Sequence, residues 1–149
     1  MNPYLEFVTE FVKNMERAAR MPHAGFPPLP RPPSSPTAGT VMLVSPPPDD
    51  EGIVGALPLR LAREAGMRVV NVALTQGSKK ERQAARFCEL EGACDYLGFD
   101  LIQVQEGGLE AINLKGKTEQ PANWEGAVER VAEIMGDRRP EIVLIPHPD

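Results

Sequence analysis

Four short segments of the sequence are mostly apolar and rich in β-branched residues. They cover residues 41–44, 68–74, 100–104 and 141–145. Strands that are apolar on both faces are typical of a parallel sheet with helices on both sides. Segments with helical patterns separate these strands, near residues 52–65, 79–97 and 122–136. The alternation predicts an α/β domain over residues 41–149, a Rossmann-like, doubly wound parallel sheet with helices on both faces. Gly66, Gly98 and Gly136 each follow a helical pattern, where a left-handed residue commonly ends a helix.

The first 21 residues carry a separate pattern. Between Tyr4 and Ala19, apolar side chains recur at the i, i+3, i+4, i+7 spacing, with charged residues outside that stripe. This spacing predicts an amphipathic helix over residues 3–20. Such a helix most commonly packs on its own domain, and docking on a membrane or a partner is the alternative. Acidic residues on the polar face disfavour a surface of anionic lipid.

Residues 22–40 join this helix to the α/β domain and contain seven prolines. Proline lacks an amide donor and fixes φ, so neither a helix nor a central strand is expected there. The composition predicts a stiff, extended linker, which we call the strap. The PxxP spacings within residues 27–33 leave an SH3-type ligand as an alternative.

Charge and cysteine content narrow the functional classes. The chain of 149 residues has 16 basic and 21 acidic residues, a net charge of −5, which disfavours a nucleic-acid binder. It has neither an apolar run long enough to span a membrane nor a secretory signal at its start. Cys88 and Cys94 lie about 9 Å apart along one predicted helix, too far for a disulfide. We therefore expect reduced thiols and a cytoplasmic protein, and a homo-oligomer remains open.

The residues that follow the strands carry the candidate chemistry. In an open parallel sheet, ligands bind beyond the carboxyl ends of the strands, where the strand order reverses. Asp49 and Asp50 follow the first strand, within a segment that we call the acidic box (residues 46–51), and His147 follows the fourth. If the chain reverses direction after the third strand, these residues converge, and carboxylates with an imidazole are typical zinc ligands. The alternatives are acidic residues that complement a helix dipole and a solvated loop histidine.

Two common active-site motifs are absent. Prolines 46–48 stand where a G-x-G-x-x-G turn would be needed, which disfavours a dinucleotide cofactor. No serine lies in a G-x-S-x-G elbow, which disfavours a serine hydrolase of that type.

Several ordered motifs resemble one family. The segment Ser45-Pro46-Pro47-Pro48-Asp49-Asp50-Glu51 resembles the P-H-P-D-D-E box of the LmbE-like, PIG-L-type N-acetylglucosaminyl deacetylases. Thr75-Gln76-Gly77 is similar to the family's T-x-G turn, and Arg86-x-x-Glu89 to its R-x-x-E helix. Pro146-His147-Pro148-Asp149 is similar to the start of its later H-P-D…H box. The resemblance covers residues 40–149.

The resemblance implies a zinc-dependent hydrolase that removes an N-acetyl or related N-acyl group from an amino sugar or similar amine. By motif position, Asp49 corresponds to the general base and Asp50 to a zinc ligand. His147 corresponds to the histidine that polarises the carbonyl or stabilises the oxyanion. Arg86 corresponds to an arginine that contacts the substrate.

Two departures from the family pattern change the expectation. The box histidine, a zinc ligand in the family, is replaced by Pro47, which has no lone pair for a metal. The sequence also stops at Asp149, before the zinc-binding histidine of the later box. Because a catalytic zinc needs about three protein ligands, we expect weak or absent zinc binding and an incomplete, inactive amino-terminal portion of a deacetylase. The alternative is a non-catalytic descendant that acts as a binding or partner-docking module.

Overall fold

The structure, a computed structural model, describes residues 2, 4–21, 27, 30, 33, 37–46 and 56–145. At its centre is a parallel sheet whose strands pair in the order β3-β2-β1-β4. The strands are β1 (Thr40–Ser45), β2 (Arg68–Ala73), β3 (Asp100–Gln103) and β4 (Ile142–Leu144). The predicted α/β, Rossmann-like fold is confirmed.

The strand order reverses once. The chain moves from β1 through β2 to β3, and β4 then returns to pair on the other side of β1. Leu43 of β1 lies opposite Leu144 of β4, while Ser45 lies opposite Ala73 of β2. The first and fourth strands are therefore neighbours, as the sequence argument required.

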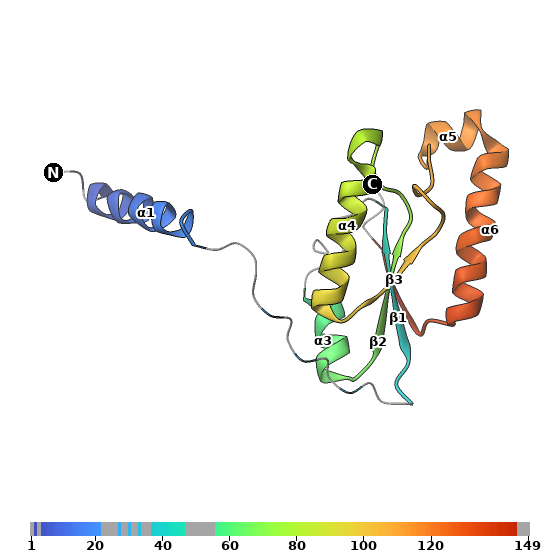
Figure 1. Ribbon diagram of the computed structural model, residues 1–149, viewed down its shortest axis with the longest axis horizontal. Helices are drawn as coiled ribbons and strands as arrows, with labels where there is room; N and C mark the ends of the chain where they lie inside the picture. The colour runs from blue at the N-terminus through green and yellow to red at the C-terminus, as the bar shows by residue number, and fades with distance from the viewer. Residues whose placement is uncertain are drawn as a thin grey trace.

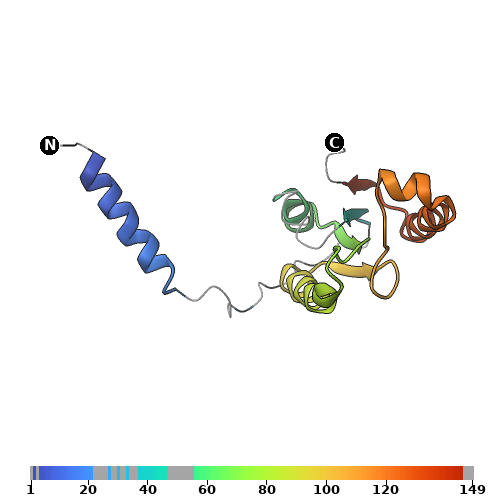
Figure 2. The same ribbon diagram turned by 90° about the horizontal axis from the view of Figure 1, so that it is seen from above.

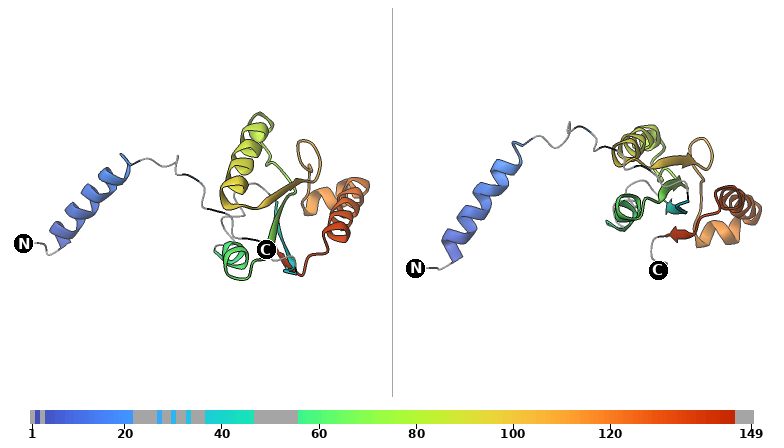
Figure 3. Two further views of the ribbon diagram at one scale, coloured as in Figure 1. Left: turned by 60° about the horizontal axis from the view of Figure 1, so that its bottom comes forward. Right: turned by 90° about the horizontal axis from the view of Figure 1, so that it is seen from below.

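Helices cover both faces of the sheet. The helices are α3 (Leu57–Glu64), α4 (Lys80–Leu97), α5 (Leu114–Glu119) and α6 (Pro121–Arg138). Figures 1 and 2 show α3 and α4 on one face, with α6 and the short α5 on the other. The two views in Figure 3 show the same division. The crossover from β3 to β4 thus runs over the opposite face from the two earlier crossovers.

The side chains of the strands alternate between two apolar layers. Val41, Val69 and Ala73 pack with Leu90 and Cys94 of α4 on one face. On the other face, the core residues Met42, Val70 and Val72 pack with Ile134 of α6. Each fully buried Val, Leu or Met side chain contributes about 1.5–3 kcal/mol relative to an exposed one. The apolar strand segments therefore form the core from which both helix layers are positioned.

The predicted helix ends are partly correct. Gly66 and Gly98 have φ values of 64° and 76°, as expected of residues that end helices. The expectation for Gly136 is wrong, because α6 continues to Arg138 and the left-handed residue is Arg139, with φ 45°. No atom lies within 4 Å of a Cβ built on Gly136, so this glycine sits in an uncrowded last turn. Pro140 follows Arg139, and a proline prevents the preceding residue from continuing a helix.

The amino-terminal helix α1 (Tyr4–Ala18) is confirmed, but its expected packing is wrong. No residue of α1 is buried, and Phe7 and Phe11 are 70% and 57% exposed. The apolar stripe thus contacts no apolar surface within the described ranges. Cys88 is exposed, Cys94 is buried in the core, and neither forms a disulfide.

Candidate functional site

The carboxyl end of β1 is anchored by a buried polar contact. The Ser45 hydroxyl donates to Asn71 Oδ1 at 2.9 Å, and Asn71 Nδ2 donates to Cys94 Sγ at 3.5 Å. Ser45 and Asn71 are both fully buried. The Ser45 carbonyl also accepts a hydrogen bond from the Leu74 amide at 3.0 Å. The residue from which the acidic box departs is therefore held against β2 by both its side chain and its backbone.

The two segments with the expected catalytic residues leave from adjacent strands. In the sequence, the acidic box follows β1 and His147 comes three positions after the end of β4. These two strands pair in parallel, so their carboxyl ends lie at the same edge of the sheet. Asp49, Asp50 and His147 themselves, like Pro47, lie outside the described residues. The adjacency of β1 and β4 is thus established, and the meeting of the side chains remains a prediction.

Arg86 lies at the same edge of the sheet. It is half-buried on α4, and its Nη1 atom occupies the space into which a side chain at Gly77 would project. Gly77 has φ 84°, and its carbonyl accepts a hydrogen bond from Gln83 Nε2 at 2.9 Å. The turn after β2 and the arginine of α4 thus pack together, which brings two of the family-like motifs into contact.

A cleft of about 410 Å³ lies beyond the carboxyl end of β2. One wall is the turn that leads into α4, and the other is the segment after β3. Polar groups lining the cleft come from Thr75, Ser78, Lys80, Gln83, Glu110 and Asn113. Leu109 and Ile112 add apolar surface, so the lining offers both hydrogen-bonding groups and an apolar face to a small ligand.

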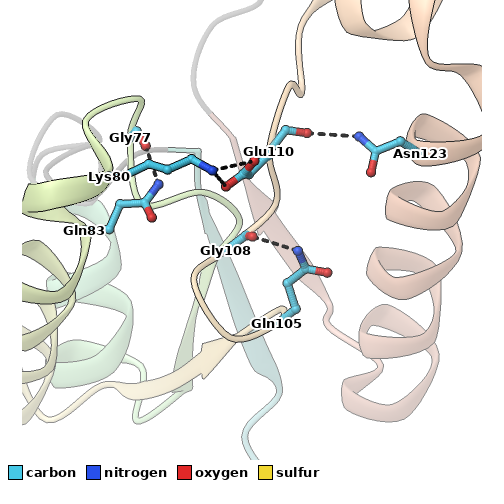
Figure 4. A network of polar contacts seen from close by, with 7 residues as sticks. All are labelled: Gly77, Lys80, Gln83, Gln105, Gly108, Glu110 and Asn123. Carbon is cyan, nitrogen blue, oxygen red and sulfur yellow. Dashed lines mark hydrogen bonds and ion pairs between the residues drawn. The ribbon is translucent and has the colours of Figure 1, made fainter.

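Polar contacts hold the two walls together. Lys80 Nζ lies 3.1 Å from Glu110 Oε1, and Figure 4 shows the two side chains reaching toward each other. The Glu110 carbonyl accepts from Asn123 Nδ2 at 3.0 Å, which ties the same segment to α6. Because Lys80 and Glu110 are largely exposed, their pairing contributes at most about 1 kcal/mol. The two walls of the cleft are therefore held together by contacts that include only a weak ion pair.

The wall formed by residues 105–113 was missed by sequence reasoning. The candidate residues identified in the sequence follow the first, second and fourth strands, and none was sought after the third. The consecutive glycines Gly107 and Gly108 were the available signal, and both have positive φ. A Cβ on Gly108 would lie 2.9 Å from the Gln76 amide nitrogen, so only glycine allows this close approach. Gly108 forms an antiparallel bridge with Thr75, which brings the missed wall against the turn after β2.

Gln76 is the least satisfied polar residue of this turn. Its side chain is 1% exposed, and neither Oε1 nor Nε2 has a hydrogen-bond partner among the residues that the structure describes. Leaving a buried amide unpaired costs about 1–3 kcal/mol. Buried polar groups without partners in native proteins often belong to functional sites. Gln76 is therefore a candidate site residue that, like the wall of residues 105–113, was not identified from the sequence.

The described part of the chain contains no zinc site. No group of three or more histidine, cysteine, aspartate or glutamate side chains there is arranged to hold a metal ion. Asp50, which the family pattern leads us to expect as a metal ligand, lies outside that part. None of the helices in the described ranges combines the length and apolar character that a membrane crossing requires.

Comparison with known protein families gave one match. The family model for the GlcNAc-PI de-N-acetylases matches residues 42–149, a range that starts in β1 and includes the acidic box and His147. Comparison with curated proteins and with solved structures gave no match. The family resemblance seen in the motifs is therefore confirmed.

Proposed function

The chain belongs to the GlcNAc-PI de-N-acetylase family, and on this premise we propose that its α/β domain is built to hydrolyse an N-acyl bond of an amino sugar or similar amine. Water adds to the amide carbonyl, the C–N bond breaks, and the products are a carboxylic acid, such as acetate, and the free amine. The observation that carries the proposal is the neighbouring position of β1 and β4 within the matched range. The segments with Asp49 and His147 leave the sheet from these two strands.

In this proposal, Asp49 is the general base that takes a proton from the attacking water. His147 stabilises the negative charge that develops on the carbonyl oxygen. Arg86 binds the substrate, a role supported by its position beside Gly77, which itself lines the cleft. The sugar ring occupies the cleft beyond β2, whose polar and apolar lining suits hydroxyl groups and a ring face.

The residues of this sequence fit the zinc site of the family poorly. Asp50 corresponds to one family ligand, but Pro47 stands where the box histidine would be. The described residues add no cluster of metal ligands. With about three protein ligands needed, we propose that the chain as it stands holds zinc weakly, and no catalytic step is assigned to the metal.

Pro47 also favours a second candidate function. A domain that loses a metal ligand but retains the cleft can still bind an amino sugar without cleaving it. In that case, the protein is a binding module. For both candidates we propose a reducing compartment such as the cytoplasm, where thiols such as those of Cys88 and Cys94 stay reduced.

Metal content and acetate release separate the two candidates. The wild-type chain and Pro47→His are compared for zinc by mass spectrometry and for acetate released from an N-acetylglucosamine-containing substrate. We expect Pro47→His to bind zinc more tightly than the wild-type chain, because its imidazole would join Asp50 as the second of about three ligands. The matched control is Pro46→His, which adds the same imidazole at the neighbouring proline and is expected to bind no more zinc than the wild-type chain. Acetate release is expected only where a third ligand completes the site, and there Asp49→Asn should lower it by at least about 100-fold and leave the zinc in place.

Other results would contradict specific parts of the proposal. Stoichiometric zinc and acetate release in the wild-type chain would show that Pro47 is no lesion. Failure of Pro47→His to gain zinc would show that the acidic box is not a metal site. Sugar binding by the wild-type chain without acetate release would favour the binding module.

A further inference from the structure

An apolar groove lies along α6, next to the cleft described above. Its volume is about 270 Å³, and every residue that lines it has an aliphatic, thioether or aromatic side chain. The lining includes Trp124, Val128 and Met135 of α6, with Leu109 and Ile112 of the segment after β3. Val128 is 53% exposed and Met135 is 39% exposed, so the groove presents apolar surface to solvent.

The groove and the cleft share part of their lining. Leu109 and Ile112 line both, whereas the other residues of the cleft are mostly polar and those of the groove are all apolar. Their combined volume falls within the range of about 300–1,000 Å³ that is typical of ligand pockets. One ligand can therefore contact both, with a polar part in the cleft and an apolar part in the groove.

Backbone hydrogen bonds connect the groove to the strand that precedes the acidic box. Leu74 lines the groove, and its amide donates to the Ser45 carbonyl at 3.0 Å. The Leu74 carbonyl accepts from the Leu109 amide at 2.7 Å. Ser45 is the last residue of β1, directly before the acidic box in the sequence. Part of the groove therefore lies at the carboxyl edge of the sheet, where the proposed hydrolysis takes place.

The size of the groove limits what can fill it. A methylene group is about the size of a water molecule, which occupies about 30 Å³. A groove of about 270 Å³ thus holds about nine groups of that size when full, and its open side leaves part of this volume to solvent. An acetyl group, which has a single methyl, would leave most of the apolar surface uncovered. A longer chain would cover it, and each buried CH₂ tightens binding up to about fourfold.

We propose that the groove holds the acyl chain of the ligand, and that this chain has about six to eight carbon atoms rather than being an acetyl group. The inference rests on the proposed function, because it places the amino sugar in the cleft and the amide where cleft and groove meet. Hydrolysis then releases a medium-chain fatty acid. The water oxygen bonds to the acyl carbon, the C–N bond breaks, and the amine leaves with a proton.

The dependence of binding on acyl chain length tests the proposal without requiring turnover. The wild-type chain is titrated by calorimetry with N-acetyl-, N-hexanoyl- and N-octanoylglucosamine, below the concentrations at which the longer ligands form micelles. We expect both longer ligands to bind at least about 10-fold more tightly than N-acetylglucosamine. Trp124 is the only tryptophan in the sequence and lines the groove, so its fluorescence should shift to the blue as the acyl chain displaces water.

A charge placed in the groove should remove this dependence. Val128→Glu should weaken the binding of N-octanoylglucosamine at least about 10-fold, because an apolar chain would lie against a carboxylate. Position 128 is more than half exposed, so the fold should be retained, which circular dichroism checks. The matched control is Ala122→Glu, an exposed position of α6 that does not line the groove. It should bind all three ligands as the wild-type chain does.

Octanamide, which has the same acyl chain without the sugar, separates this inference from the proposed function. Weaker binding of octanamide than of N-octanoylglucosamine would support one ligand that spans the cleft and the groove. If octanamide binds equally tightly and Val128→Glu weakens it, the groove holds an acyl chain but the sugar site is wrong. Equal affinities for N-acetyl- and N-octanoylglucosamine would overturn the acyl groove and leave the sugar site in place.

The exposed stripe of α1 is the competing occupant of the groove. Phe11→Glu, at a position of α1 that is 57% exposed, should leave the affinity for N-octanoylglucosamine unchanged. A higher affinity in this variant would mean that α1 covers the groove in the free protein, which would overturn the inference. Equal effects of Val128→Glu and Ala122→Glu would also overturn it, because the chain would then bind elsewhere.

Discussion

The guanidinium of Arg86 fills the space above Gly77, so that any side chain at position 77 would overlap it. The contact joins α4 to the turn after β2 and relates two sequence motifs that are nine positions apart. Glycine at position 77 suits the backbone φ of 84°, and its missing side chain leaves the space that the Arg86 guanidinium occupies.

Gly77→Ala should therefore destabilise the protein and displace Arg86. A non-glycine residue in the left-handed region costs about 1–2 kcal/mol, and the Arg86 guanidinium must move aside for the new side chain. We expect the free energy of unfolding in urea to fall by about 1–3 kcal/mol. Gly92→Ala is the matched control in α4, where no atom lies within 4 Å of the added Cβ. That change should raise the unfolding free energy by about 0.5–1 kcal/mol, and equal effects at the two glycines would contradict this account.

The Ser45–Asn71 hydrogen bond should show strong coupling in a double-mutant cycle. Asn71→Leu leaves the buried Ser45 hydroxyl unpaired and should cost about 1–3 kcal/mol of unfolding free energy. Ser45→Ala leaves the Asn71 carbonyl oxygen without this donor and should also destabilise. The double variant should cost less than the sum of the two by at least about 0.5 kcal/mol. Additive costs would mean that the bond contributes nothing to the anchoring of β1.

Replacing Gln76 should raise the stability of the protein and lower its affinity for sugar. Gln76→Met keeps a similar shape and removes a buried amide that has no partner among the described residues. The free energy of unfolding should therefore rise by about 1 kcal/mol. If the amide serves substrate binding, sugar affinity should fall in the same variant. Gln83→Met is the comparison, because it removes the hydrogen bond to the Gly77 carbonyl and should destabilise instead. A loss of stability in Gln76→Met would indicate that its amide has a partner in the folded protein.

The pKa of the Glu64 carboxyl should lie below its usual value. Its side chain accepts two hydrogen bonds from Arg60, each of 2.8 Å, which lower the pKa more than the small opposing desolvation raises it. A lowered folded-state pKa contributes stability above the unfolded pKa, and this contribution is lost as pH falls through the folded value. NMR titration should show the Glu64 pKa rising in Arg60→Gln. In about 1 M salt, where screening acts within about 3 Å, the wild-type value should move the same way. An unchanged pKa in Arg60→Gln would exclude the pairing in solution.

The elements themselves were predicted well because they depend on local patterns. The apolar runs at 41–44 and 68–74 correspond to β1 and β2, and the helix predicted at 79–97 is α4. The adjacency of β1 and β4 was also predicted from the sequence, on the condition that the chain reverses direction once after the third strand. Right-handed crossovers leave few possible strand orders. The short helix α5 was missed, since six residues, Leu114–Glu119, carry too little periodicity to stand out.

The sequence alone determined the fold class and the family, because strand periodicity and motif order are properties of short stretches. It also led to the expectation that Pro47 replaces a zinc ligand. Only the tertiary structure revealed the wall at residues 105–113, the contact of Arg86 with Gly77 and the exposure of the α1 stripe. Each depends on how segments distant in the chain pack against one another. Whether a surface is buried or exposed depends on the positions of all the elements around it. No local sequence pattern can therefore specify such contacts.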